Sequence, residues 1–177
     1  MKEIYFAGGC FWGTEKVFQA CPGVKETTVG YANGHTDNPT YIEVCTDMTG
    51  HRETVKVEYE PEEINLTTLL QVFFLVIDPT VRNRQGNDIG SQYQTGVYYS
   101  DPNDIALLET VFDEKKQQIK PFFVELKPLN HFWPAEDYHQ DYLDKNPNGY
   151  CHITPVEMLE VQKLFMRSTT VYRSRQK

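Results

Sequence analysis

The sequence predicts one α/β or α+β domain whose elements pack in two layers. Three observations support this prediction. Strand-like and helix-like segments first alternate and then mix, 40% of the 177 residues are hydrophobic, and 13% are aromatic. A chain of this length usually forms a single domain and buries about 70% of its unfolded surface. The composition is therefore sufficient for an ordinary core and too apolar for a mostly disordered chain.

The first third of the chain predicts a strand, a helix and two further strands. We expect a strand over Lys2–Ala7, a helix over Phe11–Ala20, and strands over Val24–Ala32 and Glu53–Tyr59. Two glycines end the first strand, a Cys-Pro-Gly sequence ends the helix, and apolar residues alternate with charged ones in the last strand. The segment from residue 33 to residue 50 is rich in Gly, Asn, Thr and Pro, so we expect mostly loop there.

The rest of the chain continues with apolar helices and short strands. Asp101 is a plausible cap for one of the helices because Pro102 follows it in the first turn. The expected elements are a helix over Leu66–Ile77, a loop over Arg82–Gln92, a strand over Thr95–Tyr99, a helix from Asp101 to about Ile119, a strand over Phe122–Leu126, a short helix over Pro134–Leu143 and a weak helix over Pro155–Met166.

The C-terminal residues differ from the rest in charge. Between Val161 and Lys177 there are five basic residues and no acidic one, although the whole chain has a net charge of −8. We therefore expect residues 1–155 to form the single folded domain. Residues 156–177 are expected to be a tail, weakly helical and then basic, that is solvated and mobile.

The charge and the apolar runs exclude several classes of function. The excess of 25 acidic over 17 basic residues argues against wide contact with nucleic acid or anionic membranes. The N-terminal apolar run is too short for a signal peptide, and no run has membrane length. Four scattered cysteines without a Cys-x-x-Cys pair predict reactive or buried thiols in a reducing cytoplasm, and no metal site.

The most informative motif is Gly8-Gly9-Cys10-Phe11-Trp12-Gly13, at the junction of the first strand and the first helix. A thiol at a helix N-terminus lies near unpaired N–H groups, and these favour the nucleophilic thiolate. The glycines allow a tight turn beside the sulfur. A buried cysteine packed among core aromatics would give the same local pattern, so the motif alone leaves both readings open.

Residues 9–13 are similar to the active-site motif of the A-type peptide methionine sulfoxide reductases, and about residues 3 to 153 resemble that family. The resemblance implies a ferredoxin-like core with a mixed sheet and long peripheral loops. Further matching segments follow in the order and spacing of the family: Tyr41–Cys45, Thr49–Glu53, Gln85–Tyr93, Ala135–Gln140 and Asn146–Cys151.

The resemblance implies reduction of methionine S-sulfoxide, free or in proteins, as a repair of oxidative damage. Cys10 would be the nucleophile that becomes a sulfenic acid, and Glu53 the general acid. Tyr41 and Tyr93 would donate hydrogen bonds to the sulfoxide oxygen, and Asp88 would support the polar side of the pocket. A carboxyl beside an apolar slot should retain its proton near neutral pH because desolvation disfavours the anion.

Other site residues follow from the same resemblance. Phe11 and Trp12 would form the apolar slot that receives the S-methyl group. His51, Glu136 and His139 would support the site from behind or have structural roles. Without the resemblance, each of these polar residues would be an everyday surface or strand residue.

Two ways of reducing the sulfenic acid remain open. Cys151 aligns with the resolving cysteine of the family, so it could swing to Cys10 and form a disulfide that thioredoxin reduces. The family's glycine-rich segment and further cysteine are missing after it. An external thiol such as glutaredoxin with glutathione, or dithiothreitol in vitro, could therefore act directly. We expect no bound cofactor and a monomer, with Cys21 and Cys45 as incidental residues.

Three other classes compete with this reading. A zinc module is disfavoured by the scatter of the cysteines and histidines. A hydrolase in which His139 or His51 activates Cys10 would need no reductant. An aromatic-rich interaction domain would leave the matching segments unexplained.

Overall fold

The computed structural model describes the backbone of residues 1–175 and the side chains of residues 1–166. Its centre is a sheet with strand order β7-β6-β1-β3-β2-β8. The strands are β1 (Lys2–Ala7), β2 (Val24–Ala32), β3 (Arg52–Tyr59), β6 (Gly96–Tyr99), β7 (Glu125–Pro128) and β8 (Phe132–Pro134).

The order β6-β1-β3-β2 of the four central strands is that of a ferredoxin-like fold. These strands pair antiparallel, whereas β7 joins β6 in parallel, so the sheet is mixed. Helix α1 (Phe11–Gln19) connects β1 to β2, and helix α3 (Leu66–Val76) lies in the connection from β3 to β6. The predicted fold class is confirmed.

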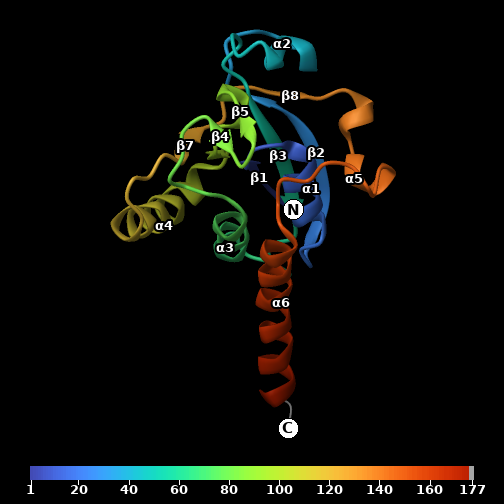
Figure 1. The fold of residues 1–177 in the computed structure, drawn as a ribbon. Coiled ribbons are helices and arrows are strands. Elements are labelled where there is room, and N and C mark those ends of the chain that lie inside the picture. The colour runs from blue at the N-terminus through green and yellow to red at the C-terminus, as the bar shows by residue number, and fades with distance from the viewer. Residues whose placement is uncertain (176–177) are drawn as a thin grey trace.

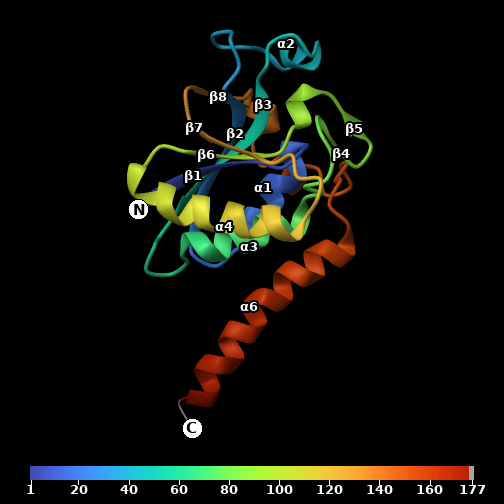
Figure 2. The same cartoon turned by 90° about the vertical axis from the view of Figure 1, so that its left-hand side faces the viewer.

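Three helices cover one face of the sheet and form the second layer. Figures 1 and 2 both show α1, α3 and α4 (Ile105–Gln118) on the same side of the strands. Aromatic side chains fill the space between the layers, where the ring of Phe6 stacks on Phe18 at 4.5 Å and lies 5.2 Å from Phe73. The core therefore holds the end of β1 and the start of α1 in fixed positions.

Two segments predicted as loop contain short regular elements. Helix α2 (Tyr41–Cys45) forms after Thr40, whose hydroxyl accepts a hydrogen bond from the Glu43 N–H at 3.2 Å. Strands β4 (Arg84–Gln85) and β5 (Asp88–Ile89) form a small antiparallel hairpin. Their sequences are too short and too polar for periodicity to reveal them.

The helix predicted over Pro134–Leu143 is wrong. Strand β8 pairs with the edge of the sheet there, with Tyr31 opposite Trp133. A 3₁₀ turn, η3 (Asp137–His139), and a four-residue helix, α5 (Tyr142–Lys145), follow it. Asp141 has a positive φ of 54°, which interrupts any continuous helix across this segment.

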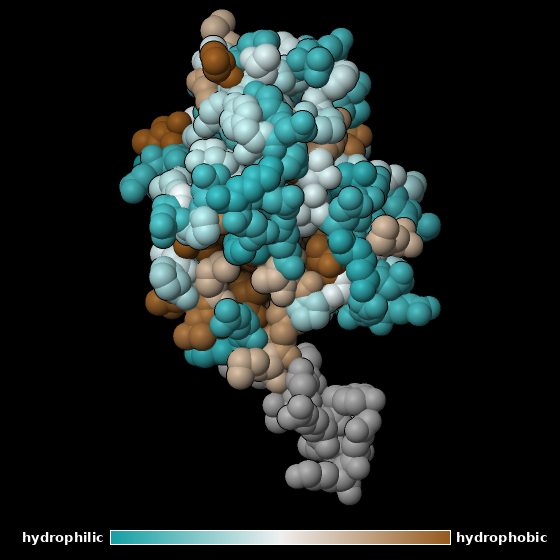
Figure 3. All heavy atoms as spheres, turned by 90° about the vertical axis from the view of Figure 1, so that its right-hand side faces the viewer, coloured by the Kyte–Doolittle hydropathy of each residue, from teal (hydrophilic) through white to brown (hydrophobic). Residues whose placement is uncertain are grey.

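The C-terminal helix α6 (Pro155–Arg175) is longer than predicted and extends away from the body (Figures 1 and 2). Its first half packs against α3, and Val161 belongs to the main hydrophobic core. Of the five basic residues in the predicted tail, Lys163 is the one whose side chain belongs to the described residues. No helix in the described part of the chain is long and apolar enough to cross a membrane. Figure 3 shows the face with α1 and α5 as mainly hydrophilic.

Candidate active site

Cys10 occupies the junction between β1 and α1, as predicted. It is the N-cap of α1, one residue after Gly9, which adopts a positive φ of 88°. A Cβ at Gly9 would lie 2.7 Å from the Cβ of Gln85, so the turn has no room for a side chain. The strand, the turn and the helix together fix the position of the sulfur.

The Cys10 side chain is 7% exposed. Burial is the main cause that raises the pKa of its thiol, and the negative charge of Asp88 acts in the same direction. Hydrogen bonds from the N–H groups of Trp12 and Gly13 lower the pKa but do not outweigh burial. The expectation that the helix N-terminus makes this sulfur anionic is wrong for the resting protein, in which Cys10 is a neutral thiol.

Glu53 provides an acidic group next to this thiol. It lies on β3, opposite Tyr31 of β2, and is 1% exposed. Its Oε1 accepts a hydrogen bond from the Phe11 N–H at 3.1 Å, and its Oε2 has no partner among the described residues. Burial raises the pKa of Glu53 to about 8, so this carboxyl retains its proton at neutral pH, as expected.

Two tyrosines share the environment of Glu53. Burial is the main cause that raises the pKa of both Tyr41 and Tyr93, and a charge on Glu53 would raise it further. The charge of Asp88 acts on Tyr93 in the same direction. Both hydroxyls therefore remain protonated donors, and Tyr93 lies within electrostatic range of the thiol and both carboxyls.

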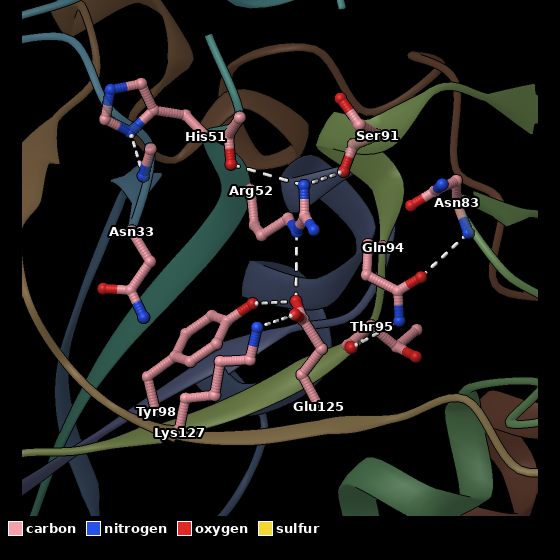
Figure 4. Close-up of polar contacts among 12 residues, drawn as sticks. Asn33, His51, Arg52, Asn83, Ser91, Gln94, Thr95, Tyr98, Glu125 and Lys127 are labelled. Carbon is pink, nitrogen blue, oxygen red and sulfur yellow. Dashed lines mark hydrogen bonds and ion pairs between the residues drawn. The ribbon is translucent and has the colours of Figure 1, made fainter.

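A polar network holds the turn that carries Tyr93 against β3 (Figure 4). Arg52, the residue before Glu53, donates to the carbonyl of Ser91 at 3.1 Å, and Ser91 opens the 3₁₀ turn η1 (Ser91–Tyr93). The Arg52 guanidinium also donates to Oε1 of Glu125 at 3.0 Å, and the Tyr98 hydroxyl donates to the same oxygen at 2.9 Å. The network fixes Tyr93 relative to Glu53.

Asp88 enters the site from the β4–β5 hairpin. Its Oδ2 accepts a hydrogen bond of 2.9 Å from the Tyr150 hydroxyl. The charge of Asp88 raises the pKa of Cys10 and of Glu53, so it lies near both. This arrangement connects the hairpin to the segment that contains Cys151.

Phe11 and Trp12 differ in their surroundings. Phe11 is 1% exposed and packs within the main core, whereas Trp12 is half-buried at its edge. The indole N–H of Trp12 donates to Nδ1 of His139 at 3.0 Å, and its ring stacks on Tyr142 at 3.8 Å. The ring of His139 also lies 4.5 Å from that of Tyr41. His139 thus connects Trp12, part of the apolar wall that Phe11 and Trp12 form, to Tyr41.

Glu136 supports the same wall from behind. Its carboxylate accepts hydrogen bonds from the Tyr31 hydroxyl at 2.8 Å and from the Tyr41 N–H at 3.0 Å. Burial acts to raise the pKa of Glu136, but these hydrogen bonds hold it below its ordinary value. Glu136 is therefore an anion that positions the start of α2.

His51 organises a loop. Its Nδ1 accepts a hydrogen bond from the Gly34 N–H at 3.0 Å, and its Nε2 lies 2.7 Å from the carbonyl of Thr36 (Figure 4 shows the ring). These contacts fit the structural reading that the sequence left open for His51.

The four cysteines occupy different environments. Cys151 is exposed, yet its sulfur would lie 2.9 Å from a Cβ at Gly13, in the first turn of α1. Cys21 is buried and donates to the Val17 carbonyl. Cys45 is exposed, and burial is the main cause that raises the pKa of its thiol. Cys151 therefore lies against the first turn of the helix that Cys10 caps.

The sequence analysis missed several groups around the site, namely Tyr142, Tyr150 and His152. Each makes its contact with a residue distant in the chain or lies in a short irregular segment, so no periodic pattern indicates it. In the described part of the chain, no three His, Cys, Asp or Glu side chains are grouped as a metal site would require.

A ferredoxin-like sheet with a buried thiol at a helix N-terminus, beside a protonated carboxyl, defines a thiol-based oxidoreductase. Known proteins identify the family. The family model of peptide methionine sulfoxide reductase matches residues 2–169. The chain therefore belongs to the peptide methionine sulfoxide reductase family and is an oxidoreductase of that family, as the resemblance implied.

Individual relatives agree. The peptide methionine sulfoxide reductase MsrA of Mycoplasma genitalium is 56% identical over 154 residues, which cover 86% of this chain and 98% of the relative. The MsrA of Clostridium acetobutylicum is 52% identical over 161 residues, covering 90% and 99%.

Solved structures show the same fold. Mxr1 of Saccharomyces cerevisiae in reduced form matches with a TM-score of 0.81 and 36% identity, covering 86% of this chain and 91% of that one. Methionine sulfoxide reductase A of Corynebacterium diphtheriae matches at 0.76 and 39%, covering 85% and 77%. A structure of the yeast Mxr1 in complex with Trx2 matches at 0.57 and 26%, covering 80% and 84%.

Proposed function

We propose that this protein reduces methionine S-sulfoxide to methionine through a sulfenic acid on Cys10. The observation that carries the proposal is the Glu53 carboxyl, which burial keeps protonated beside the thiol. A sulfoxide is a poor electrophile because its oxygen must leave with negative charge. A buried acid that neutralises this oxygen removes that obstacle, and it acts more strongly in a site of low dielectric constant.

The first step transfers the sulfoxide oxygen to the enzyme. The sulfur of Cys10 attacks the sulfoxide sulfur, while Glu53 gives its proton to the oxygen and takes up the proton of the Cys10 thiol, and Tyr41 and Tyr93 donate hydrogen bonds to the oxygen. The oxygen then passes to Cys10 as the methionine sulfur leaves. Methionine sulfur gains two electrons, and Cys10 sulfur loses two and becomes a sulfenic acid. Asp88 holds the polar side of this space through Tyr150.

The apolar wall selects the methyl end of the substrate. Trp12 is fixed on one edge by His139 and on one face by Tyr142, so its ring is a rigid surface. We place the S-methyl group against Trp12 and the edge of Phe11. Methionine sulfoxide that is free or exposed in an oxidised protein would reach such a site.

Cys151 resolves the intermediate in the second step. Its thiol attacks the Cys10 sulfur, a disulfide forms, and the sulfenic oxygen leaves as water. Its position against Gly13 on α1 supports this role over direct reduction by an external thiol. A dithiol reductant then regenerates both thiols. Thioredoxin is the favoured donor, because the related yeast Mxr1 has been solved in complex with the thioredoxin Trx2. We propose that the enzyme acts as a cytoplasmic monomer without a bound cofactor.

One experiment tests both steps. Wild-type protein is given one equivalent of methionine S-sulfoxide without reductant, and the products are quenched and identified by mass spectrometry. We expect one equivalent of methionine and a Cys10–Cys151 disulfide. Cys10→Ser should form no methionine, and turnover within a few-fold of wild type would disprove the role of Cys10. A sulfenic acid that persists on Cys10 would show that an external thiol is the reductant.

A further inference from the structure

His152, next to the proposed resolving cysteine, has one ring nitrogen in a defined state. Its Nε2 lies 2.8 Å from the carbonyl oxygen of Gly8. A carbonyl can only accept a hydrogen bond, so Nε2 bears the hydrogen. In a neutral imidazole the other nitrogen, Nδ1, then has a free lone pair.

This Nδ1 is buried and has no hydrogen-bond partner among the described residues. A Cβ at Gly13 would meet both the sulfur of Cys151, at 2.9 Å, and Nδ1 of His152, at 3.2 Å. The two atoms therefore lie on the same side of the first turn of α1. A buried acceptor without a partner destabilises the folded protein, so its presence calls for an explanation.

The charged groups around His152 do not protonate it. Burial is the main cause that lowers the pKa of the ring below its ordinary value. The Gly8 carbonyl and the charges of Asp88 and Glu157 act in the opposite direction without reversing the shift. The ring is therefore neutral at pH 7, and its Nδ1 carries a lone pair.

We propose that His152 is the general base of the resolving step, an inference that rests on the proposed role of Cys151. In the resting protein the Cys151 thiol donates to the Ile153 carbonyl at 3.6 Å. When its sulfur turns towards Cys10, Nδ1 takes the thiol proton, and the thiolate attacks the sulfenic sulfur. The S–S bond forms, the S–O bond breaks, and the proton on Nδ1 joins the leaving hydroxide as water. No additional oxidant or reductant is needed.

His152→Gln tests this role with little change in packing. The glutamine amide nitrogen can retain the hydrogen bond to Gly8, while the basic lone pair is lost. We expect disulfide formation at pH 7 to slow by about 100-fold or more, the range for loss of a general base. The rate in the variant should then rise with pH towards that of wild type, because hydroxide can remove the thiol proton that His152 removes in the wild-type protein. The wild-type rate should be flat around neutrality.

The readouts separate three outcomes. Methionine released in the first turnover measures the sulfoxide step, and alkylation with mass spectrometry measures the disulfide. A His152→Gln protein that forms the disulfide within threefold of wild type, with the same pH profile, would overturn the role of His152. If wild-type protein forms no Cys10–Cys151 disulfide, the proposed role of Cys151 fails instead.

A measurement on the unmodified protein does not depend on the folding of any variant. Nitrogen-15 NMR of the histidine rings at pH 7 should show His152 as the neutral tautomer with its hydrogen on Nε2. A hydrogen on Nδ1, or a charged ring, would leave no lone pair beside Cys151 and would exclude the proposal.

Discussion

Glu53→Gln should make the protein more stable and far less active. Burial raises the pKa of Glu53 from its ordinary 4.5 to about 8 in the folded protein. Between these values the folded state holds a proton that the unfolded state has lost, so wild-type stability falls as pH rises. Each pH unit in this window costs about 1.4 kcal/mol. Glutamine cannot ionise, and its oxygen can still accept the Phe11 N–H.

The gain in stability should therefore grow with pH. Between about pH 5.5 and about pH 7.5 the free energy of unfolding of the variant should rise by about 3 kcal/mol relative to wild type. The same substitution removes the proton that neutralises the sulfoxide oxygen. We expect methionine formation in a single turnover to slow by about 10²–10⁴-fold, the usual contribution of a positioned acid.

Two assays on the same preparations check this. Urea unfolding at the two pH values measures the free energy, and rapid-quench analysis measures methionine formation. Glu15→Gln is a matched control, because Glu15 is 2% exposed and burial raises its pKa to about 7. Its carboxylate accepts hydrogen bonds from Thr27 and from the Asp141 N–H, away from the thiol. It should affect stability in the same direction and leave methionine formation unchanged.

The two results refute different parts of the reasoning. A stability difference that is equal at both pH values would show that the buried carboxylate is tolerated and that burial does not keep Glu53 protonated. A normal rate of methionine formation in Glu53→Gln would show that another group protonates the oxygen. An effect of equal size on methionine formation in Glu15→Gln would assign the loss to disturbance of α1 rather than to a missing acid.

Two further predictions follow from the cysteine environments. Gly13→Ala should slow Cys10–Cys151 disulfide formation, because the new Cβ would lie 2.9 Å from the Cys151 sulfur. Quenched single turnovers measure the rate of disulfide formation, and an unchanged rate would contradict the close contact. Iodoacetamide at pH 7 should modify the exposed Cys45 and Cys151 before the buried Cys10 and Cys21, since burial raises the pKa of both buried thiols. Mass spectrometry over time gives the order of labelling. Early labelling of Cys10 would show an anionic resting thiol.

The sequence predicted the sheet well because its strands and the helices between them carry strong periodic patterns. The alternation that places Val55 and Val57 in the core also places Glu53 on that buried face. This position in the alternation indicates that the Glu53 carboxyl is buried, and a buried glutamate without a cationic partner must keep its proton. The signal was available in the sequence, but only the packing shows what the carboxyl faces.

Contacts between distant segments could not be predicted in the same way. Trp12 meets His139 across 127 positions, and Tyr150 meets Asp88 across 62. Such contacts depend on the conformation of the loops that return to the sheet. Short polar loops have no hydrophobic periodicity from which this conformation could be inferred. The family resemblance supplied Asp88 and His139 as candidates, but not the partners that hold them.

The environment of Cys10 is the clearest case in which a local rule fails. A helix N-terminus lowers the pKa of a thiol through a few N–H groups, and two of them do contact Cys10. Near-complete burial and the charge of Asp88 oppose them and prevail, because an anion is costly in a poorly solvated space. The resting site is thus a neutral thiol beside a neutral acid. A neutral thiol in the substrate-free site resists oxidation, since the thiolate is the reactive form. It becomes a nucleophile only when the bound sulfoxide oxygen can take up a proton within the site.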